Sequence, residues 1–593
     1  MADGPQRSYG ILDGIGGSGR WVEQKIEDSS NSAGIPTSIY TRPLGVLEAK
    51  FDHAASQDGM SDICLQFDVE ISELEGRKAF FARIVLAWAT LRCRHPLLAS
   101  TMQTSEGDVC SLPGSRILRY VPPPTQDAAI EDARRTVLLG DVKTMKDVLA
   151  ERALNGPRRL LEQESCLARL LVFRDVDDSS SPRLGLLLVI AHAISDGLAV
   201  IAIVSELCTL LASPSLPTPS TPPPFISILE FLANPSGNLI VWHDTTHAAM
   251  SWEILPLRGD LSTSLPPSSE SIYLPHLSGV NTAPPLSAGD IVLPESITKA
   301  TLARQRWFWC ISRALLIVRN RRTPRTLPFP RIAREGPPVQ PNTEWVPMRF
   351  SNDHTTSLLG FCKHHKISPS MLSYSILSIA VSNILKRLYP DAPYQPILIG
   401  FPMSLRRFLL SQPALSDIAI RITFGCVHLP RSPQATTEEN YTSLRWAALT
   451  GARLASRQLQ RMFDPSPKER KHFLASSYYM IMDRLLSSHG VNANPLEAAA
   501  GVINASMVGD LDRTLPASHI LPTSPPSSLR LSNIILGTRL HRGEGMLMEA
   551  FTWDGRLTFC LGFDDFCVEP KLVDEILSQV QQVGEALADA WES

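Results

Sequence analysis

The stretch 184–197 constrains the fold of this chain more than any other. Residues 184–190 read Leu-Gly-Leu-Leu-Leu-Val-Ile, and a short apolar run bounded by turn residues is typical of a buried strand. The run His192-Ala-Ile-Ser-Asp196-Gly197 follows, and an apolar helical pattern occupies 198–211. Gly197 lets this turn approach neighbouring backbone closely. The sequence therefore predicts an imidazole held between a buried strand and a helix.

The residues before this turn predict a further strand and a helix of the same α/β lobe. Residues 167–173 form a second strand-like run, separated from the first by the turn-like segment 177–182. Residues 80–92 have helical periodicity and end at Cys93-Arg94-His95-Pro96, where the proline stops the helix.

The last third of the chain predicts a second α/β lobe that begins near Trp345. Asp554-Gly555 between two strand-like runs is a strong signal for a hairpin. The predicted elements are a helix over 368–388, a strand over 395–400, the hairpin strands 546–553 and 556–563, and a closing helix over 571–590.

These patterns divide the 593 residues into four parts. We expect a mobile N-terminal tail over 1–35, rich in Gly, Ser and Asp, and an N-terminal lobe over 36–232. Residues 233–340 are expected to hold a crossover and insertion, and residues 341–593 a C-terminal lobe. No repeat of fixed period is present.

Composition excludes several classes of protein. A hydrophobic content of 44% with 19% charged residues fits a globular protein with a large core. The net charge of −3 gives no reason to expect a nucleic-acid partner. None of the ten cysteines forms a C-x-x-C pair, so neither a zinc knuckle nor a disulfide framework is expected. A reducing compartment follows, and we expect the cytoplasm.

Membrane insertion is not expected either. The N-terminus has no basic region followed by an apolar one, so no secretory signal is predicted. The apolar run 307–318 contains Arg313 and is shorter than the about 20 residues that span a bilayer. The basic stretch 301–331 is interpreted as a solvated helix face, with contact to an anionic cofactor or membrane surface as the alternative.

His192 is the strongest candidate for chemistry. Imidazole titrates near neutral pH and can take a proton from an alcohol or amine that attacks a thioester. The spacing alone favours a core histidine followed by Asp196 as an ordinary helix N-cap. Ser195 lacks a G-x-S-x-G context, which argues against a serine hydrolase.

Other motif-like patterns carry little weight. The run 14–19 matches G-x-G-x-x-G, but no strand precedes it. The spacing of His243 and His247, and the pair His364-His365, resemble metal ligands without a third partner. We therefore predict neither a dinucleotide site nor a metal.

The run 189–197, Val-Ile-Ala-His-Ala-Ile-Ser-Asp-Gly, resembles the H-x-x-x-D-G motif of the chloramphenicol-acetyltransferase-like superfamily. Segments 94–98 (Arg-His-Pro-Leu-Leu), 399–406 (Ile-Gly-Phe-Pro-Met-Ser-Leu-Arg) and 504–509 (Asn-Ala-Ser-Met-Val-Gly) resemble further motifs in the same order. The layout is most similar to fungal trichothecene 15-O-acetyltransferase-like proteins. Ala191 replaces the second His that condensation domains often carry, and the D-F-G-W-G motif of the plant branch is absent.

The resemblance implies two α/β sandwich lobes with a tunnel between them. His192 would lie midway along it as general base, with acyl-CoA entering from one side and the acceptor from the other. Asp196 and Gly197 would shape the turn, and Asp196 would pair with an arginine. Arg406 is the first candidate partner and Arg94 the second. The tunnel or substrate candidates are Ser404, Asn504 and Ser506.

The expected function is acyl transfer, with acetyl the expected group, from acyl-CoA to a hydroxyl of a small secondary metabolite. Acyl-CoA would be a co-substrate, no cofactor would be permanently bound, and the protein would be a monomer. The alternative is a free-standing condensation-type enzyme that takes its acyl group from a carrier protein. A binding protein on the same scaffold is a third reading, disfavoured by the intact motif.

Overall fold

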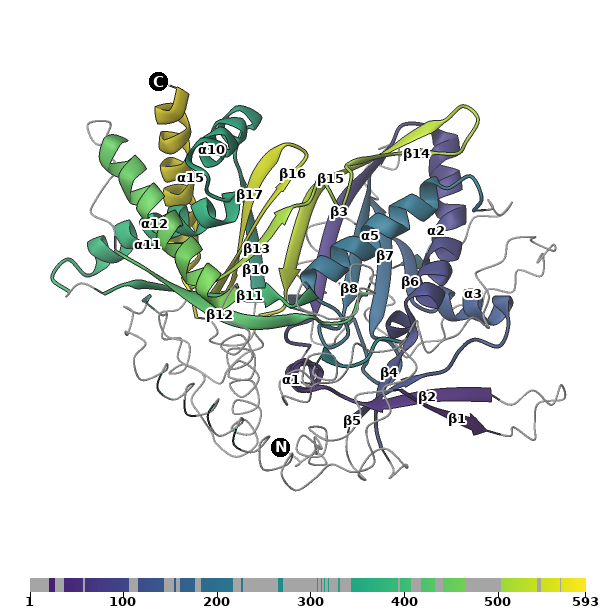
Figure 1. Cartoon of the computed structure of the whole chain (residues 1–593). Coiled ribbons are helices and arrows are strands. Elements are labelled where there is room, and N and C mark those ends of the chain that lie inside the picture. The colour runs from purple at the N-terminus through teal and green to yellow at the C-terminus, as the bar shows by residue number, and fades with distance from the viewer. Residues whose placement is uncertain are drawn as a thin grey trace.

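The chain folds into two α/β lobes that lie side by side (Figure 1). The computed structural model describes residues 21–26, 37–56, 59–105, 116–142, 154–155, 160–175, 183–216, 226–227, 265–269, 307, 311, 314, 318, 329–330, 343–392, 395–406, 417–431, 441–463, 503–540, 545–565 and 567–592. The predicted α/β fold with two lobes is confirmed.

The first lobe is built on a seven-stranded sheet in the order β14-β15-β3-β8-β7-β6-β9. The helices α2, α3 and α5 belong to this lobe (Figure 1). The bounds are β3 Ile63–Ile71, β6 Val137–Val142, β7 Ala168–Asp175, β8 Arg183–Ile190, β9 Ile226–Ser227, β14 Ser518–Leu521, β15 Ser527–Thr538, α2 Leu74–Arg94, α3 Gln126–Arg134 and α5 Gly197–Ala212.

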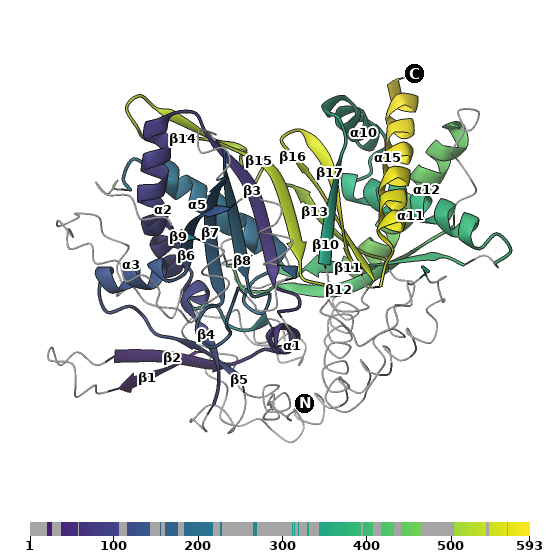
Figure 2. The ribbon, with the colours of Figure 1, turned by 180° about the vertical axis from the view of Figure 1, so that it is seen from behind.

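The second lobe is built on a six-stranded sheet in the order β10-β17-β16-β13-β11-β12. Four helices gather on one face of this sheet (Figure 2). The bounds are β10 Thr343–Arg349, β11 Ile397–Ser404, β12 Ile422–Leu429, β13 Ile503–Asp510, β16 Met546–Trp553, β17 Arg556–Asp564, α10 Asn352–His365, α11 Pro369–Leu388, α12 Tyr441–Phe463 and α15 Pro570–Glu592.

The predicted helices and hairpin are confirmed, and local chemistry explains their ends. Ser368 caps α11, its hydroxyl accepting from the amide of Met371 at 3.3 Å, and Pro369 occupies the first helical position. α2 ends at the residue before His95, and Pro96 then begins a short 3-10 turn, Pro96–Ala99. Asp554 and Gly555 both have positive φ in the β16–β17 turn.

A small sheet lies beneath the first lobe and corrects one prediction. Its order is β1-β2-β5-β4, with β1 Val22–Ile26, β2 Thr37–Pro43, β4 Thr101–Thr104 and β5 Arg116–Tyr120. The expected mobile tail over 1–35 is therefore wrong at β1, which pairs antiparallel with β2. The surrounding Gly and Ser residues obscure a strand whose stability comes from this pairing.

The boundary predicted for the C-terminal lobe is also wrong at one place. β14 and β15 fall inside 341–593, yet β15 pairs antiparallel with β3 in the first sheet. Trp345 of β10 closes the junction: its indole nitrogen donates to the carbonyl of Thr538 at 3.0 Å. A strand pattern identifies a strand without identifying its partner, so the sequence could not reveal this crossover.

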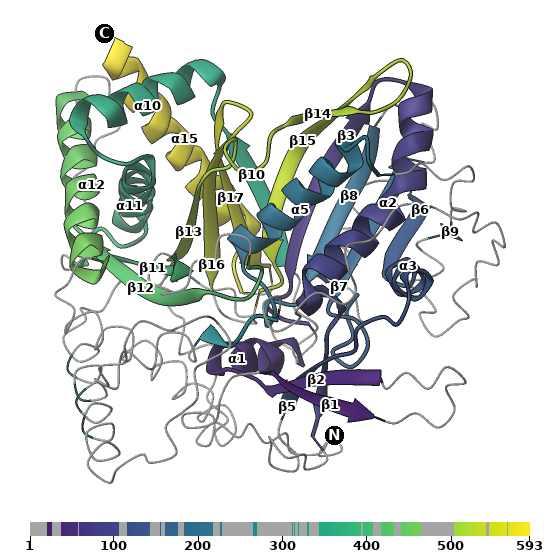
Figure 3. The same ribbon diagram turned by 45° about the vertical axis from the view of Figure 1, so that its right-hand side comes forward.

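The second sheet opens between β11 and β13. Both strands run for eight residues, but they pair only at Ile399 with Ile503 and at Gly400 with Asn504. Pro402 of β11 has no amide hydrogen to donate to a neighbouring strand. Figure 3 shows β11 and β12 diverging from β13 toward the first lobe. The part of β11 that follows Gly400 therefore reaches the lobe boundary.

No single helix among the described residues is both long and apolar enough to cross a bilayer. α10 and α11 meet that measure only as a pair, with a bend of 110° between them.

We predict that Gly537→Ala destabilises the lobe junction by about 1–3 kcal/mol, because overpacking a filled core forces shifts. A Cβ at Gly537 would stand 2.7 Å from the Trp345 ring. Urea unfolding of both proteins measures the cost. In a Trp345→Leu background the same substitution should cost clearly less, since the obstructing ring is gone. Equal costs in both backgrounds would contradict this packing.

Candidate functional site

The described contacts give His192 a defined tautomer. It lies directly after β8 in a turn held by the amide of Ala191, which donates to Leu167 at 2.9 Å, and that of Ile194, which donates to Ala191 at 3.0 Å. Its Nδ1 is 2.8 Å from the carbonyl oxygen of Ser195. A carbonyl only accepts, so Nδ1 carries the hydrogen and Nε2 has the lone pair. The turn thus holds a neutral imidazole with one basic nitrogen.

An aromatic ring and an ammonium group lie beside this imidazole. Phe51 stacks on the His192 ring with centroids 3.8 Å apart and an angle of 16°. The Lys50 ammonium is 4.8 Å from the centroid of Phe51 and 4.3 Å from that of Phe424 on β12. Lys50 and Phe51 come from the first lobe and Phe424 from the second. The site therefore lies at the boundary of the two lobes.

Burial of the ring lowers the pKa of His192 to about 4. The hydrogen bond to Ser195 and the charge of Asp196 oppose this effect, and the charge of Lys50 reinforces it. The folded protein therefore keeps His192 neutral at physiological pH, which is the form that can accept a proton.

Two buried ion pairs fix the helix that carries Lys50 and Phe51. This helix, α1 Val46–Ala55, contributes Asp52, which binds Arg116 at 3.0 Å, and Glu48, which binds Arg42 at 2.6 Å. No motif in the sequence marks α1 as part of a site. The available signal was the presence of two acids, Glu48 and Asp52, among the apolar residues of this helix. Their arginine partners lie on strands, and the sequence does not show how those strands pair.

Asp196 is 2% exposed and receives three donors. Its Oδ1 accepts from the amide of Ala199 at 3.1 Å and so caps α5. Its Oδ2 accepts from Nη1 of Arg406 at 2.7 Å and from the backbone amide of Arg421 at 2.9 Å. Asp196 therefore both caps α5 and pairs with an arginine, the two roles considered from the sequence. Its carboxylate joins the two lobes.

Arg406 and Arg421 extend this network into the second lobe. Nη2 of Arg406 donates to the carbonyls of Asp417 at 3.1 Å and Ala419 at 3.0 Å. Arg421 is fully buried, and its Nη2 binds the carboxylate of Asp417 at 2.6 Å. Both arginines are thus held by several acceptors, so Asp196 meets a rigid partner.

Arg94, the second candidate partner of Asp196, lies elsewhere. Its Nη1 binds Glu206 of α5 at 2.6 Å, and Nε2 of His95 lies 2.8 Å from the same carboxylate. This cluster ties the end of α2 to α5, and it lowers the pKa of Glu206 to about 2 against the opposing effect of burial. Arg94 supports the first lobe and does not contact the His192 turn through these bonds.

Ser404, Asn504 and Ser506 lie on one face of the second sheet. They alternate with residues of β11 and β13 that face the helical core, among them Ile503 and Ala505. All three candidates are half-buried. They border the opening between β11 and β13, on the face opposite the helices.

Glu549 is a buried acid that the sequence analysis missed. It pairs in register with Ser506 on β13 and with Cys560 on β17, so it shares their face of the sheet. It is 5% exposed, its Oε2 has no hydrogen-bond partner in the described part of the chain, and burial raises its pKa well above the usual range. A single acid inside the apolar run 546–551 was the available signal.

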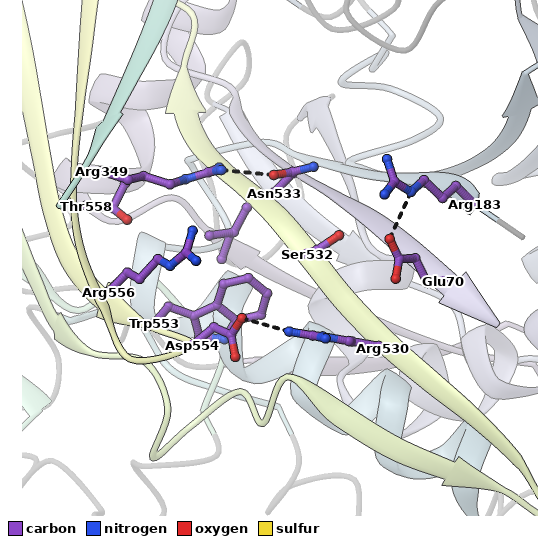
Figure 4. Close-up of a pocket in the computed structure, with 11 residues that line it drawn as sticks. Glu70, Arg183, Arg349, Arg530, Ser532, Asn533, Trp553, Asp554, Arg556 and Thr558 are labelled. Carbon is purple, nitrogen blue, oxygen red and sulfur yellow. Dashed lines mark hydrogen bonds and ion pairs between the residues drawn. The ribbon is translucent and has the colours of Figure 1, made fainter. Parts of the chain in front are cut away.

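A cavity of about 390 Å³ lies between the two sheets, at the end of β8 opposite His192. Its wall includes four arginines, Arg183, Arg349, Arg530 and Arg556, and the acids Glu70 and Asp554 (Figure 4). His192 does not line this cavity. A continuous tunnel from here to His192 stays a prediction.

Within the described residues, the histidine pair of α10 forms no metal site. No group of three potential ligands occurs among the described residues. His364 and His365 lie at the end of α10, where both rings pack near Trp591. His243 and His247 lie outside the described residues, as does most of the basic stretch 301–331.

Comparison with known proteins identifies the fold. No family model and no curated protein sequence matches the chain. The structure of a trichothecene 15-O-acetyltransferase from Fusarium sporotrichioides matches with a TM-score of 0.63 at 15% identity, covering 96% of this chain and 97% of that one. A cyclization-docking bidomain of a peptide synthetase from Sorangium cellulosum matches with a TM-score of 0.51 at 12% identity, covering 93% and 85%.

An epimerization domain of tyrocidine synthetase B matches with a TM-score of 0.51 at 12% identity, covering 97% of this chain and 99% of that one. Identities this low establish the shared two-lobed architecture. They leave the chemistry to the residues of this chain.

We predict that Asp196→Asn lowers the free energy of unfolding by about 3–5 kcal/mol, because it leaves the buried Arg406 uncompensated. Arg406→Ala should cost a similar amount, and the double variant much less than the sum. Thermal and urea unfolding of the four proteins measure the cycle. Simple additivity would show that the 2.7 Å contact carries little energy.

The low pKa of His192 predicts a specific loss of stability in acid. The unfolded chain binds this proton near pH 6.5 and the folded chain near pH 4, so the unfolded state binds more protons in between. Stability should therefore fall by about 3 kcal/mol as the pH drops through that window. His192→Gln should remove this contribution, which urea titrations at pH 7, 5.5 and 4.5 can show. The same slope in both proteins would refute the shift.

Proposed function

We propose that this protein transfers an acyl group from an acyl thioester to a hydroxyl group, with His192 as general base. The observation that carries the proposal is the tautomer of His192. Nδ1–H donates to Ser195, Nε2 keeps its lone pair, and the low pKa keeps the ring neutral. An oriented neutral imidazole at the boundary of two lobes is suited to take a proton from a bound acceptor.

The reaction needs only this base and bound substrates. Nε2 removes the hydroxyl proton while the oxygen attacks the thioester carbonyl, which gives a tetrahedral oxyanion and an imidazolium. Collapse of the intermediate breaks the carbon–sulfur bond, and the imidazolium returns its proton to the departing sulfur. The products are an ester and a free thiol. The charge of Lys50 acts on the His192 ring, and we propose that the same charge stabilises the oxyanion.

Asp196 acts on this chemistry by position. Its carboxylate is occupied by Ala199, Arg406 and Arg421, so it holds the turn and has no oxygen directed at Nδ1, which binds Ser195 instead. Gly197 begins α5 directly behind it. We assign Asp196, Gly197 and Arg406 to the support of His192, and Ser404, Asn504 and Ser506 to the walls of the substrate space.

The donor we propose is acyl-CoA, with acetyl as the acyl group, and the acceptor is an alcohol of a small secondary metabolite. The similarity to a trichothecene acetyltransferase supports this choice, as does Ala191, which stands where condensation domains often carry a second His. The protein is proposed to act as a cytoplasmic monomer. The second candidate, a condensation-type enzyme with a carrier-bound donor, draws on the peptide-synthetase neighbours.

We predict that the purified protein releases thiol from acetyl-CoA in the presence of at least one member of a panel of small alcohols. His192→Ala should lower turnover by about 10²- to 10⁴-fold, the usual effect of losing a general base. His519→Ala on β14 is the control and should keep full activity. Near-full turnover by His192→Ala would end the mechanism. Turnover only with a carrier-bound acyl group would favour the second candidate.

A further inference from the structure

The arginine-lined cavity between the sheets has an excess of positive charge. Two of its arginines meet carboxylates: Nε of Arg183 binds Glu70 at 2.9 Å, and Nη2 of Arg530 binds Asp554 at 3.2 Å. Figure 4 shows both pairs as dashed lines among the lining residues. Their charges cancel, so the excess comes from the other two arginines.

Arg349 and Arg556 are held by neutral groups. Nη1 of Arg349 donates to the amide oxygen of Asn533 at 2.9 Å, and Nε of Arg556 donates to that of Asn352 at 2.9 Å. Each guanidinium has five N–H donors, so both retain donors for a ligand. Asp68 accepts a hydrogen bond from Asn533, and including it still leaves the cavity positive.

Both lobes contribute to this cavity. Arg183, Arg530 and Asn533 come from the first sheet, and Arg349 and Arg556 from the second. Asn533 has a positive φ at the irregularity of β15, which places its side chain opposite Arg349. A ligand bound here would contact two lobes at once, at the end of the inter-lobe space remote from His192.

We propose that this cavity binds the phosphate groups of the CoA thioester donor, chiefly through Arg349 and Arg556. The inference rests on the proposed function and deepens it. Arginine binds phosphate oxygens through two parallel hydrogen bonds, and charged pairs of this kind are stronger than neutral ones. CoA presents a diphosphate and a 3′-phosphate, so it matches an excess of positive charge better than the single phosphodiester of a carrier-bound arm.

The test compares two donors that differ only in their phosphates. Arg349→Gln and Arg556→Gln should each raise the KM for acetyl-CoA about tenfold, since a hydrogen bond to a charged group is lost. kcat should change little, and the KM for acetyl-pantetheine, which has no phosphate, should stay the same. The matched control is Arg513→Gln, an exposed arginine paired with Asp510 outside the cavity.

Calorimetric titration with CoA separates this inference from the proposed function. Wild type should bind CoA, and each cavity variant should bind it about tenfold more weakly while Arg513→Gln binds normally. If both donors lose affinity equally, or neither does, the phosphate site is refuted even when acyl transfer stands. If wild type releases no thiol from any donor yet the binding pattern holds, the function fails and the site remains.

Discussion

The carboxylate of Asp196 is a buried contact that joins the two lobes. One oxygen caps α5 in the first lobe, and the other accepts from Arg406 and from the amide of Arg421 in the second. The same residue follows His192 by four positions in the sequence. One buried group therefore sets the start of α5, the geometry of the turn and the contact between the lobes. Breaking a pair of this kind costs about 3–5 kcal/mol, since the remaining charge has no water around it.

A second constraint is that the two faces of the second sheet pack against different parts of the protein. Alternate residues of β11, β13, β16 and β17 pack on the four helices, which leaves the other face for the first lobe. That face carries Ser404, Ser506 and Glu549 among apolar neighbours, and the strands separate beside Pro402. Polar groups are thus placed by strand alternation at the lobe boundary, while the opposite face forms a continuous apolar core.

Local patterns in the sequence predicted local structure well, whereas the one distant partner predicted correctly, Arg406 for Asp196, came from the family resemblance. The Asp-Gly hairpin, the capped helix α11 and the strand–turn–helix around His192 follow from short-range patterns that the structure reproduces. The pairing of Arg94 with Glu206 and of β15 with β3 depends on residues far away in the chain, which no local pattern specifies. Lys50 and Phe51 escaped notice for the same reason, because only tertiary packing brings α1 to His192.

The strand exchange at β15 has a consequence for how the protein is made. Asp68 on β3 and Asn533 at β15 are hydrogen-bonded although 465 residues separate them. During synthesis, β3 leaves the ribosome early. The edge of β3 that pairs with β15 stays unpaired until almost the whole chain has been made. An unpaired strand edge is a template for association with other chains. The nascent first lobe is therefore expected to depend on chaperones until its last-made strand docks, and release of a truncated chain ending before β15 would leave that edge open for good.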